Sequence, residues 1–211
     1  MLYHSKLLNH MKSVLLSLLC ISISYSVFSS EAAWKLEKDK DGIKIWNRRQ
    51  VNSNLKEYKG VVVVQSSIEK LITFFRNYKM YEKWMYKVDE GSAKLIKKVS
   101  DDEFYVRVTM SAPLIKSRES VTHFTINKPD AKGVVMVNLE TTPDLIPLNR
   151  DFVRIPKMKG YWKFVPLENG KVEITHQAPI IAGGYIPDAM ANLGAVDAPF
   201  SMLSDLRLNL K

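Results

Sequence analysis

Few residues of this chain have the type and spacing that catalysis or metal binding requires. The sequence contains no HExxH, GxSxG or glycine-rich phosphate-binding motif, and beyond residue 30 it has no cysteine and two histidines, His123 and His176. Two histidines without a third ligand at useful spacing do not make a zinc site. Each lies in a segment that alternates like a strand, where a histidine is usually hydrogen-bonded or at the surface. The sequence therefore favours a protein without catalytic activity, metal or cofactor.

Charged residues in the strands are better candidates for binding. In residues 104–110, apolar side chains share one face and Arg107 lies on the other. If that second face lines an interior cavity, Arg107 could meet a hydroxyl, carboxylate or phosphate of a ligand. If it faces outward, Arg107 is simply exposed. A buried arginine needs a partner, and Glu119 and Asn138 on neighbouring strands are the candidates.

A long, proline-flanked connection at residues 141–147 is a second candidate region. Long connections are often gates or binding loops. Leu145, Ile146 and Leu148 could roof a cavity or lie against a membrane, or they could pack on the domain. Arg154, which follows, could be structural or could contact a ligand.

The first thirty residues are predicted to be a secretory signal peptide, because Lys6 and Lys12 precede an uncharged apolar run at residues 14–27. An uncleaved anchor is the alternative, and Met11 would serve equally well as the start. The remaining residues, 31–211, fit one globular domain. We expect an exported protein, periplasmic in a Gram-negative host and otherwise secreted.

Residues 31–211 contain 29 basic and 22 acidic residues, because residues 1–30 hold two lysines and no acids; the net charge is therefore +7. Nucleic acid is not an expected partner of an exported chain. The charge could attract anionic lipid headgroups in transient membrane contact, or it could be a solvated basic face.

Most of the chain reads as strands that must carry these side chains. Residues 31–39 are compatible with a short helix, Ser66–Ser67 begins a helix, and residues 78–88 suggest a further helical piece. Alternating strand patterns occupy residues 43–47, 55–64, 93–99, 104–110, 118–126, 134–139, 161–166 and 172–177. The order predicts an α+β fold with a meandering antiparallel sheet.

A long amphipathic helix is expected from Pro187 to Leu210. Its apolar stripe, which must pack against the sheet, consists of Ile186, Met190, Leu193, Val196, Phe200, Leu203, Leu206 and Leu210. Pro199 removes the hydrogen bond to Ala195 and is expected to kink or split the helix. The first half could then open as a lid, or the bend could simply follow the sheet.

Short blocks in a fixed order resemble the START family of lipid-transfer domains. They are Trp34, DGIKIW at 41–46, KEYKG at 56–60, YEKWM at 81–85, PL at 113–114, SRE at 117–119, VR at 153–154, GYWKFVP at 160–166, GGYIP at 183–187 and Asn192. The resemblance covers residues 34–210; Glu119 stands where the family usually has Asp, which preserves the charge.

The resemblance implies a helix-grip fold, in which a curved antiparallel sheet wraps around the C-terminal helix and a tunnel between them holds one lipid or sterol-like molecule. It also implies that Arg118 and Glu119 form a salt bridge or contact the cavity wall. The candidate ligand-binding residues are then Arg107, Arg118, Glu119, Asn138, Tyr161, Met190, Leu193 and Phe200.

We therefore expect a monomer that carries one hydrophobic molecule across an aqueous compartment. One alternative is a helix-grip enzyme, of cyclase or hydrolase type, that acts on a hydrophobic substrate; it would need an acid or base within the tunnel. Another is an interaction module whose interior is filled.

Overall fold

The computed structural model describes residues 32–113, 115–181, 183–184 and 186–210. The chain divides into two units, residues 1–30 and 31–211, and the described residues belong to the second. The signal-peptide prediction lies outside the described residues. None of the described helices has the length and hydrophobicity needed to cross a membrane.

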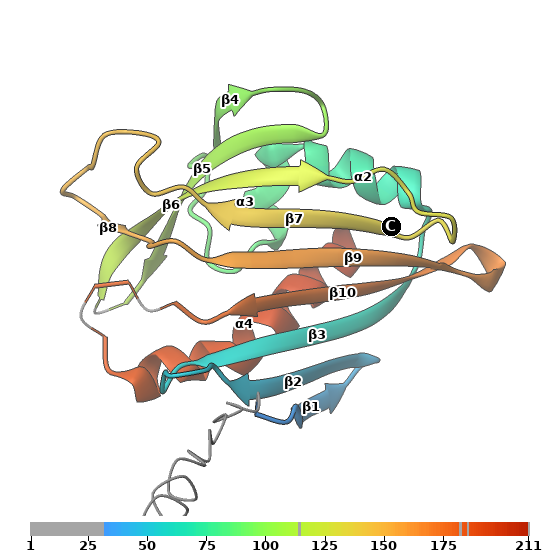
Figure 1. Ribbon diagram of the computed structural model, residues 1–211, viewed down its shortest axis with the longest axis horizontal. Coiled ribbons are helices and arrows are strands. Elements are labelled where there is room, and N and C mark those ends of the chain that lie inside the picture. The colour runs from blue at the N-terminus through green and yellow to red at the C-terminus, as the bar shows by residue number, and fades with distance from the viewer. Residues whose placement is uncertain (1–31, 114, 182, 185, 211) are drawn as a thin grey trace, which may run out of the picture. The chain divides into compact units, whose positions relative to one another are not determined.

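The described residues form one ten-stranded sheet (Figure 1). Its strands are β1 (Lys35–Lys40), β2 (Ile43–Arg49), β3 (Lys56–Gln65), β4 (Lys94–Lys98), β5 (Glu103–Ala112), β6 (Ile115–Ile126), β7 (Val135–Thr141), β8 (Val153–Arg154), β9 (Lys159–Leu167) and β10 (Lys171–Pro179). The path across the sheet runs β1-β2-β3-β10-β9-β7-β6-β5-β4, with antiparallel neighbours throughout. β8 lies off this path and pairs with β6 in parallel.

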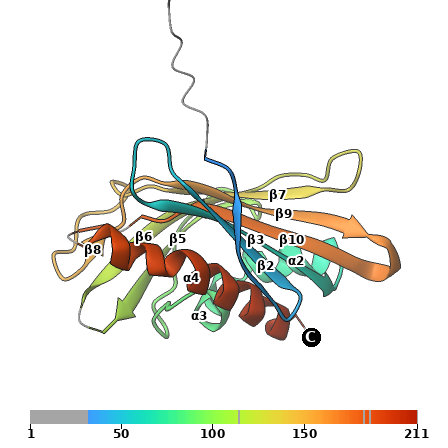
Figure 2. The same cartoon turned by 90° about the horizontal axis from the view of Figure 1, so that it is seen from below.

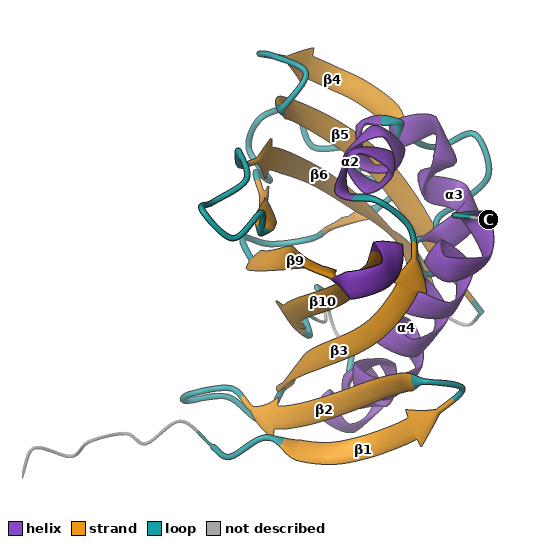
Figure 3. Cartoon of the chain, turned by 90° about the vertical axis from the view of Figure 1, so that its right-hand side faces the viewer, coloured by secondary structure: helices purple, strands orange, loops and turns teal. Residues whose placement is uncertain are grey.

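The sheet curves around the long helix α4 (Asp188–Asn209), and Figure 3 shows the helix on its concave side. The shorter helices α2 (Ile68–Arg76) and α3 (Tyr81–Trp84) lie on the same side of the sheet as α4 (Figure 2), and Figure 3 shows them near β4–β6. This is the expected α+β helix-grip fold. Period-two alternation favours it, because the central strands place mainly apolar side chains on the concave face, where the core lies.

An aromatic core fills the concave side beneath α2 and α3. The ring of Phe75 lies 5.0 Å from that of Trp84 and 5.2 Å from those of Trp162 and Phe164, measured between centroids. All four side chains are buried. Ser67 caps α2 by accepting a hydrogen bond from the backbone N–H of Lys70, so this helix begins where the sequence predicts.

Three local predictions need correction. Residues 35–40 form an edge strand rather than a helix, because pairing with β2 outweighs the helical propensity of the lysines and acids. The helical piece at 78–88 is limited to a 3-10 turn, η1 (Tyr78–Met80), and α3. Pro199 does not split the last helix, which is continuous from Asp188 to Asn209.

Candidate functional site

The two halves of α4 differ sharply in burial. From residue 199 onward the helix buries Pro199, Met202, Leu203 and Leu206. Between residues 188 and 198, all of which the structure describes, it buries Ala195 alone. Its main contacts are with β2, β3 and α3. The second half therefore belongs to the core, while the first half contributes one buried side chain to it.

The expected apolar stripe is buried in its second half only. Leu203, Leu206 and Leu210 are buried, as predicted, and Phe200 is half-buried with the ammonium of Lys38 3.8 Å from its ring centroid. Met190 and Leu193, however, are 54% and 71% exposed. Exposed apolar side chains of this size lie at the end of the domain where α4 begins.

Asn47 explains how Pro199 fits within a continuous helix. A proline has no N–H, so the carbonyl of Ala195 lacks its usual helical donor. The carboxamide of Asn47 faces the carbonyl oxygens of Ala195 at 2.9 Å and Trp46 at 3.0 Å, and therefore presents its nitrogen to them. Asn47 is 2% exposed. A side chain of β2 thus replaces the hydrogen bond that Pro199 removes.

The concave face of β5, β6 and β7 combines apolar and polar groups. Alternation places Met110 of β5 and Arg118, Ser120 and Thr122 of β6 on the concave face. The hydroxyls of Ser120 and Thr122 lie 2.8 Å apart. Thr141 of β7 shares this face and donates a hydrogen bond to the carbonyl of Pro156 at 2.6 Å.

Arg118 is the charged residue on this concave surface. Its Nη1 donates to the carbonyl oxygen of Lys116, and burial lowers its pKa from the ordinary value. Arg118 lies opposite Met110 on β5 and Val153 on β8. The expected salt bridge between Arg118 and Glu119 does not form, because neighbours along a strand point to opposite faces.

Glu119 instead joins two other arginines on the convex face. Arg107 donates from Nε to Glu119 Oε1 at 2.7 Å, and Arg154 donates from Nη2 to Oε2 at 2.7 Å. The Glu119 side chain is 3% exposed. Burial alone would raise its pKa, but the hydrogen bonds from Arg107 and Arg154 outweigh burial and hold that pKa below the ordinary value.

Arg154 also fastens the connection between β7 and β8. Its guanidinium donates to the carbonyl oxygens of Pro143, Ile146 and Pro147, the last at 2.9 Å. The sequence analysis did not predict that Arg154 holds this connection. The sequence features that could have indicated it are the proline-flanked connection and the arginine that follows it. Arg154 is therefore structural here, and Leu145 and Leu148 beside it remain 41% and 66% exposed.

Asn138 and Tyr161 also lie on the convex face, away from α4. They line an outer cleft, which we define by Glu57, His123, Thr125, Asn138, Leu139, Glu140, Lys159, Gly160, Tyr161 and Gln177. The predicted ligand residues thus divide between two surfaces. Arg118 lies on the concave face, whereas Arg107, Glu119, Asn138 and Tyr161 lie on the convex one.

His176 lies in the interior, where it is held by structural hydrogen bonds. Its Nδ1 is 3.0 Å from the Tyr161 carbonyl, which requires an N–H there, so Nε2 accepts from the Tyr58 hydroxyl at 2.7 Å. Its ring stacks on Trp162 at 3.8 Å. Burial lowers the pKa of His176 to about 4, so the ring is neutral at neutral pH. His123 lies apart on the convex face, 3.1 Å from Glu103.

Known structures and sequences support this architecture. A crystal structure of a STAR-related lipid transfer protein (fragment 25–204) from Xanthomonas axonopodis is 35% identical, with a TM-score of 0.77 over 84% of this chain and 98% of that one. Human STARD10 is 16% identical, with a TM-score of 0.71 over 84% of this chain and 72% of that one, which shows the shared fold.

The sequence comparisons extend the relationship to a second bacterium. An uncharacterised protein of Pseudomonas aeruginosa is 34% identical over 175 residues, which cover 82% of this chain and 85% of the relative. No family model matches the chain. Identity above 30% to the Xanthomonas protein, over nearly its whole length, agrees with the ordered blocks and the curved sheet around α4. The chain belongs to the StAR-related lipid transfer (START) family.

Proposed function

We propose that this protein binds one lipid or similar hydrophobic molecule between the concave face of the sheet and the first half of α4, and carries it through an aqueous compartment. The observation that carries the proposal is the contrast between the two halves of α4. The second half is locked into the aromatic core, whereas the first half keeps large apolar side chains exposed. Enclosing an apolar molecule there would remove its surface, and that of the helix, from water at about 25 cal/mol per Å².

Arg118 is the residue proposed to contact the polar head of the ligand. It lies on the concave face with two hydroxyl side chains, and among the described residues its only hydrogen-bond acceptor is a backbone carbonyl. The guanidinium has five N–H groups, so most of them are available to a phosphate, carboxylate or hydroxyl. The ligand would therefore have an acceptor-rich head and an apolar body.

The same end of the domain is proposed to touch the membrane during exchange. Met190 and Leu193 are exposed there on α4, and Leu145 and Leu148 are exposed on the connection before β8. Gly184, four residues before α4 begins, lies against Val153 of β8, because a Cβ at Gly184 would be 3.1 Å from the Val153 side chain. Lys116 and Arg150 add positive charge beside that connection, where the Lys116 ammonium donates to the Arg150 carbonyl at 2.5 Å. Anionic headgroups would favour such a surface.

The proposal includes export directed by residues 1–30, and it does not include catalysis. His176 is a buried imidazole, and both of its nitrogens are engaged by Tyr58 and the Tyr161 backbone. A general base needs a free nitrogen within reach of its substrate. The arrangement thus supports binding rather than turnover.

Native mass spectrometry of the protein purified from its own host tests the proposal directly. We expect a co-purifying lipid in a one-to-one complex. Finding no co-purifying lipid, together with no binding to a lipid extract of the host, would refute the proposal.

A matched pair of tryptophan variants tests where the ligand binds. Met110→Trp adds bulk on the concave face of β5, and Met136→Trp adds the same bulk on the convex face of β7. We expect the first to reduce uptake of a fluorescent lipid from vesicles at least tenfold, and the second to leave it unchanged. Equal uptake by both variants, at unchanged melting temperature, would place the ligand elsewhere.

A further inference from the structure

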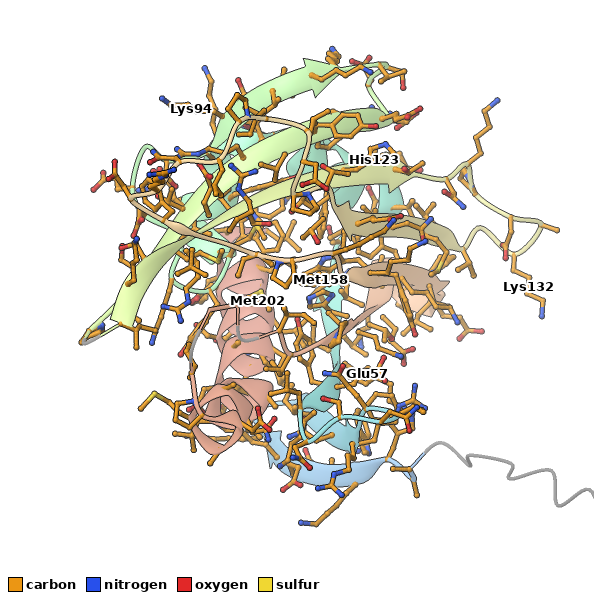
Figure 4. All side chains as sticks on the ribbon, turned by 60° about the vertical axis from the view of Figure 1, so that its left-hand side comes forward. Glu57, Lys94, His123, Lys132, Met158 and Met202 are labelled. Atoms are coloured by element: carbon orange, nitrogen blue, oxygen red, sulfur yellow. The ribbon has the colours of Figure 1, made fainter. Side chains whose placement is uncertain are left out.

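The outer cleft has a built, polar lining that the lipid-binding function does not use. It encloses about 460 Å³ on the convex face, within the range of small-molecule sites. Two cross-strand rows of side chains form its walls. Glu57 from β3 and His123 from β6, both labelled in Figure 4, come from strands on its opposite sides. The strands between them form the floor.

Strand pairing explains the hollow. One row runs Thr125, Asn138, Tyr161, Gln177 across directly paired positions of β6, β7, β9 and β10. The next row consists of His123, Glu140 and Lys159 on β6, β7 and β9. It has no paired residue on β10, because the pairing of β9 with β10 ends at Tyr161 opposite Gln177. Gly160 allows the backbones of β9 and β10 to approach closely where their pairing ends, since a Cβ at Gly160 would lie 2.8 Å from the Gln177 carbonyl oxygen.

The charges of the lining are compensated internally. Glu57 accepts a hydrogen bond from Arg48 at 2.7 Å, and Glu140 pairs with Lys157 at 2.9 Å and with Lys159 at 3.2 Å. An anionic ligand would meet the two carboxylates, and a cationic ligand would meet the lysines. Among the described residues of the lining, Leu139 is the only large aliphatic one.

The remaining groups offer neutral hydrogen bonds in an ordered array. The Tyr161 hydroxyl donates to Gln177 Oε1 at 2.8 Å, and Gln177 Nε2 donates to Glu57 Oε1 at 2.7 Å. Within the described part of the chain, the Thr125 hydroxyl has no hydrogen-bond partner, and Asn138 makes one bond, from Nδ2 to Asn127 at 3.3 Å. Hydroxyl, carboxamide and phenol groups thus alternate as donors and acceptors along one row.

We propose that the outer cleft binds a neutral saccharide. Ring hydroxyls donate and accept at spacings that a row of amide, hydroxyl and carboxylate groups can match, and they carry no charge to conflict with the paired ions. The open mouth suits one or two sugar rings of a longer chain. The same chemistry could come from a free oligosaccharide or from the sugar head of a glycolipid.

Calorimetric titration of the full chain with maltotriose and with the trisaccharide of N-acetylglucosamine tests the site. Vesicles with and without a glucosyl diacylglycerol form a second arm, and binding only to sugar-bearing vesicles would identify a glycolipid head. We expect at least one of these probes to bind with a Kd below about 10 mM, which corresponds to more than about 2.7 kcal/mol. Failure of every probe at that concentration would overturn the proposal.

Conservative variants separate the cleft from non-specific binding. Asn138→Ala and Thr125→Val should each raise the Kd at least fivefold, while Thr175→Val, one row away on β10 and outside the lining, should not change it. Equal weakening by all three, or by none, would refute the assignment. All three variants should take up lipid normally, because the cleft lies on the face opposite α4, so loss of lipid binding would tell against the proposed function instead.

Discussion

The hydrogen bond between Asn47 and Ala195 makes a quantitative prediction about α4. The Ala195 carbonyl is buried and has no helical donor because of Pro199, and Asn47 supplies one at 2.9 Å. Asn47→Leu keeps the branched shape and the number of side-chain heavy atoms and removes the donor. Leaving a buried carbonyl unpaired costs about 1–3 kcal/mol, so we expect the free energy of unfolding to fall by that amount.

The same substitution should cost much less in a Pro199→Ala background. Residue 199 then has an N–H that can donate to the Ala195 carbonyl, so Asn47 is no longer its sole donor. We expect the cost of Asn47→Leu to drop below about 1 kcal/mol, which is a coupling of at least about 1 kcal/mol between the two positions. Equilibrium unfolding in urea, with constant m-values, measures all four proteins.

Asn192 provides a matched control on the same helix. Its side chain accepts from the Lys56 N–H at 2.8 Å and donates to the Asn54 carbonyl at 2.9 Å, so it stabilises α4 without serving Ala195. Asn192→Leu should cost the same in the wild-type and Pro199→Ala backgrounds. If Asn47→Leu also costs the same in both backgrounds, Asn47 does not compensate for Pro199 and the reasoning is refuted.

Three further outcomes follow from single contacts. Glu119→Gln should lower the free energy of unfolding by about 3–5 kcal/mol at neutral pH, because Arg107 and Arg154 would keep buried charge without a counter-ion. Because the two arginines hold the pKa of Glu119 below its ordinary value against the effect of burial, the wild type should also lose stability as the pH falls below the ordinary carboxyl range; urea titration measures both effects. His176 has a pKa of about 4 in the folded protein against an ordinary value of 6.5, so only the unfolded chain binds its proton between those values; stability should fall by about 3 kcal/mol as the pH drops from 6.5 to 4, and His176→Phe should flatten that slope. An unchanged slope would mean that another group titrates. Gly160→Ala should lower stability by about 1–3 kcal/mol, since its Cβ would lie 2.8 Å from a backbone oxygen, and a melting temperature equal to wild type would contradict that geometry.

Most of the fold follows from local patterns. Alternation located β2, β3, β5–β7, β9 and β10, and the Asn169–Gly170 turn between β9 and β10 adopts the positive φ values, 59° and 68°, that its sequence indicates. Residues 35–40 were misassigned because an edge strand with alternating lysines and acids has no apolar face to identify it. This segment is a strand because it pairs with β2, and that pairing depends on the tertiary structure.

The candidate site was predicted only in part. The sequence offered Glu119 and Asn138 as candidate partners of Arg107, and the structure pairs Arg107 with Glu119, while Asn138 bonds to Asn127. Periodicity also predicted that Met190 and Leu193 would join the buried stripe of α4, and they are exposed. An apolar stripe indicates which residues share one side of a helix. How much of that side is buried depends on which parts of the tertiary structure pack against it.

The amino-acid sequence by itself determined most of the order of strands and helices, the family blocks, and which side chains of one strand share a face. Only the tertiary structure decided which face of each strand meets α4, that Arg154 rather than Arg118 pairs with Glu119, and that Asn47 completes a helix that begins more than a hundred residues later. The reason is physical. Side-chain alternation is a local property of the backbone, whereas burial and hydrogen-bond partners depend on what packs against that backbone from distant parts of the chain.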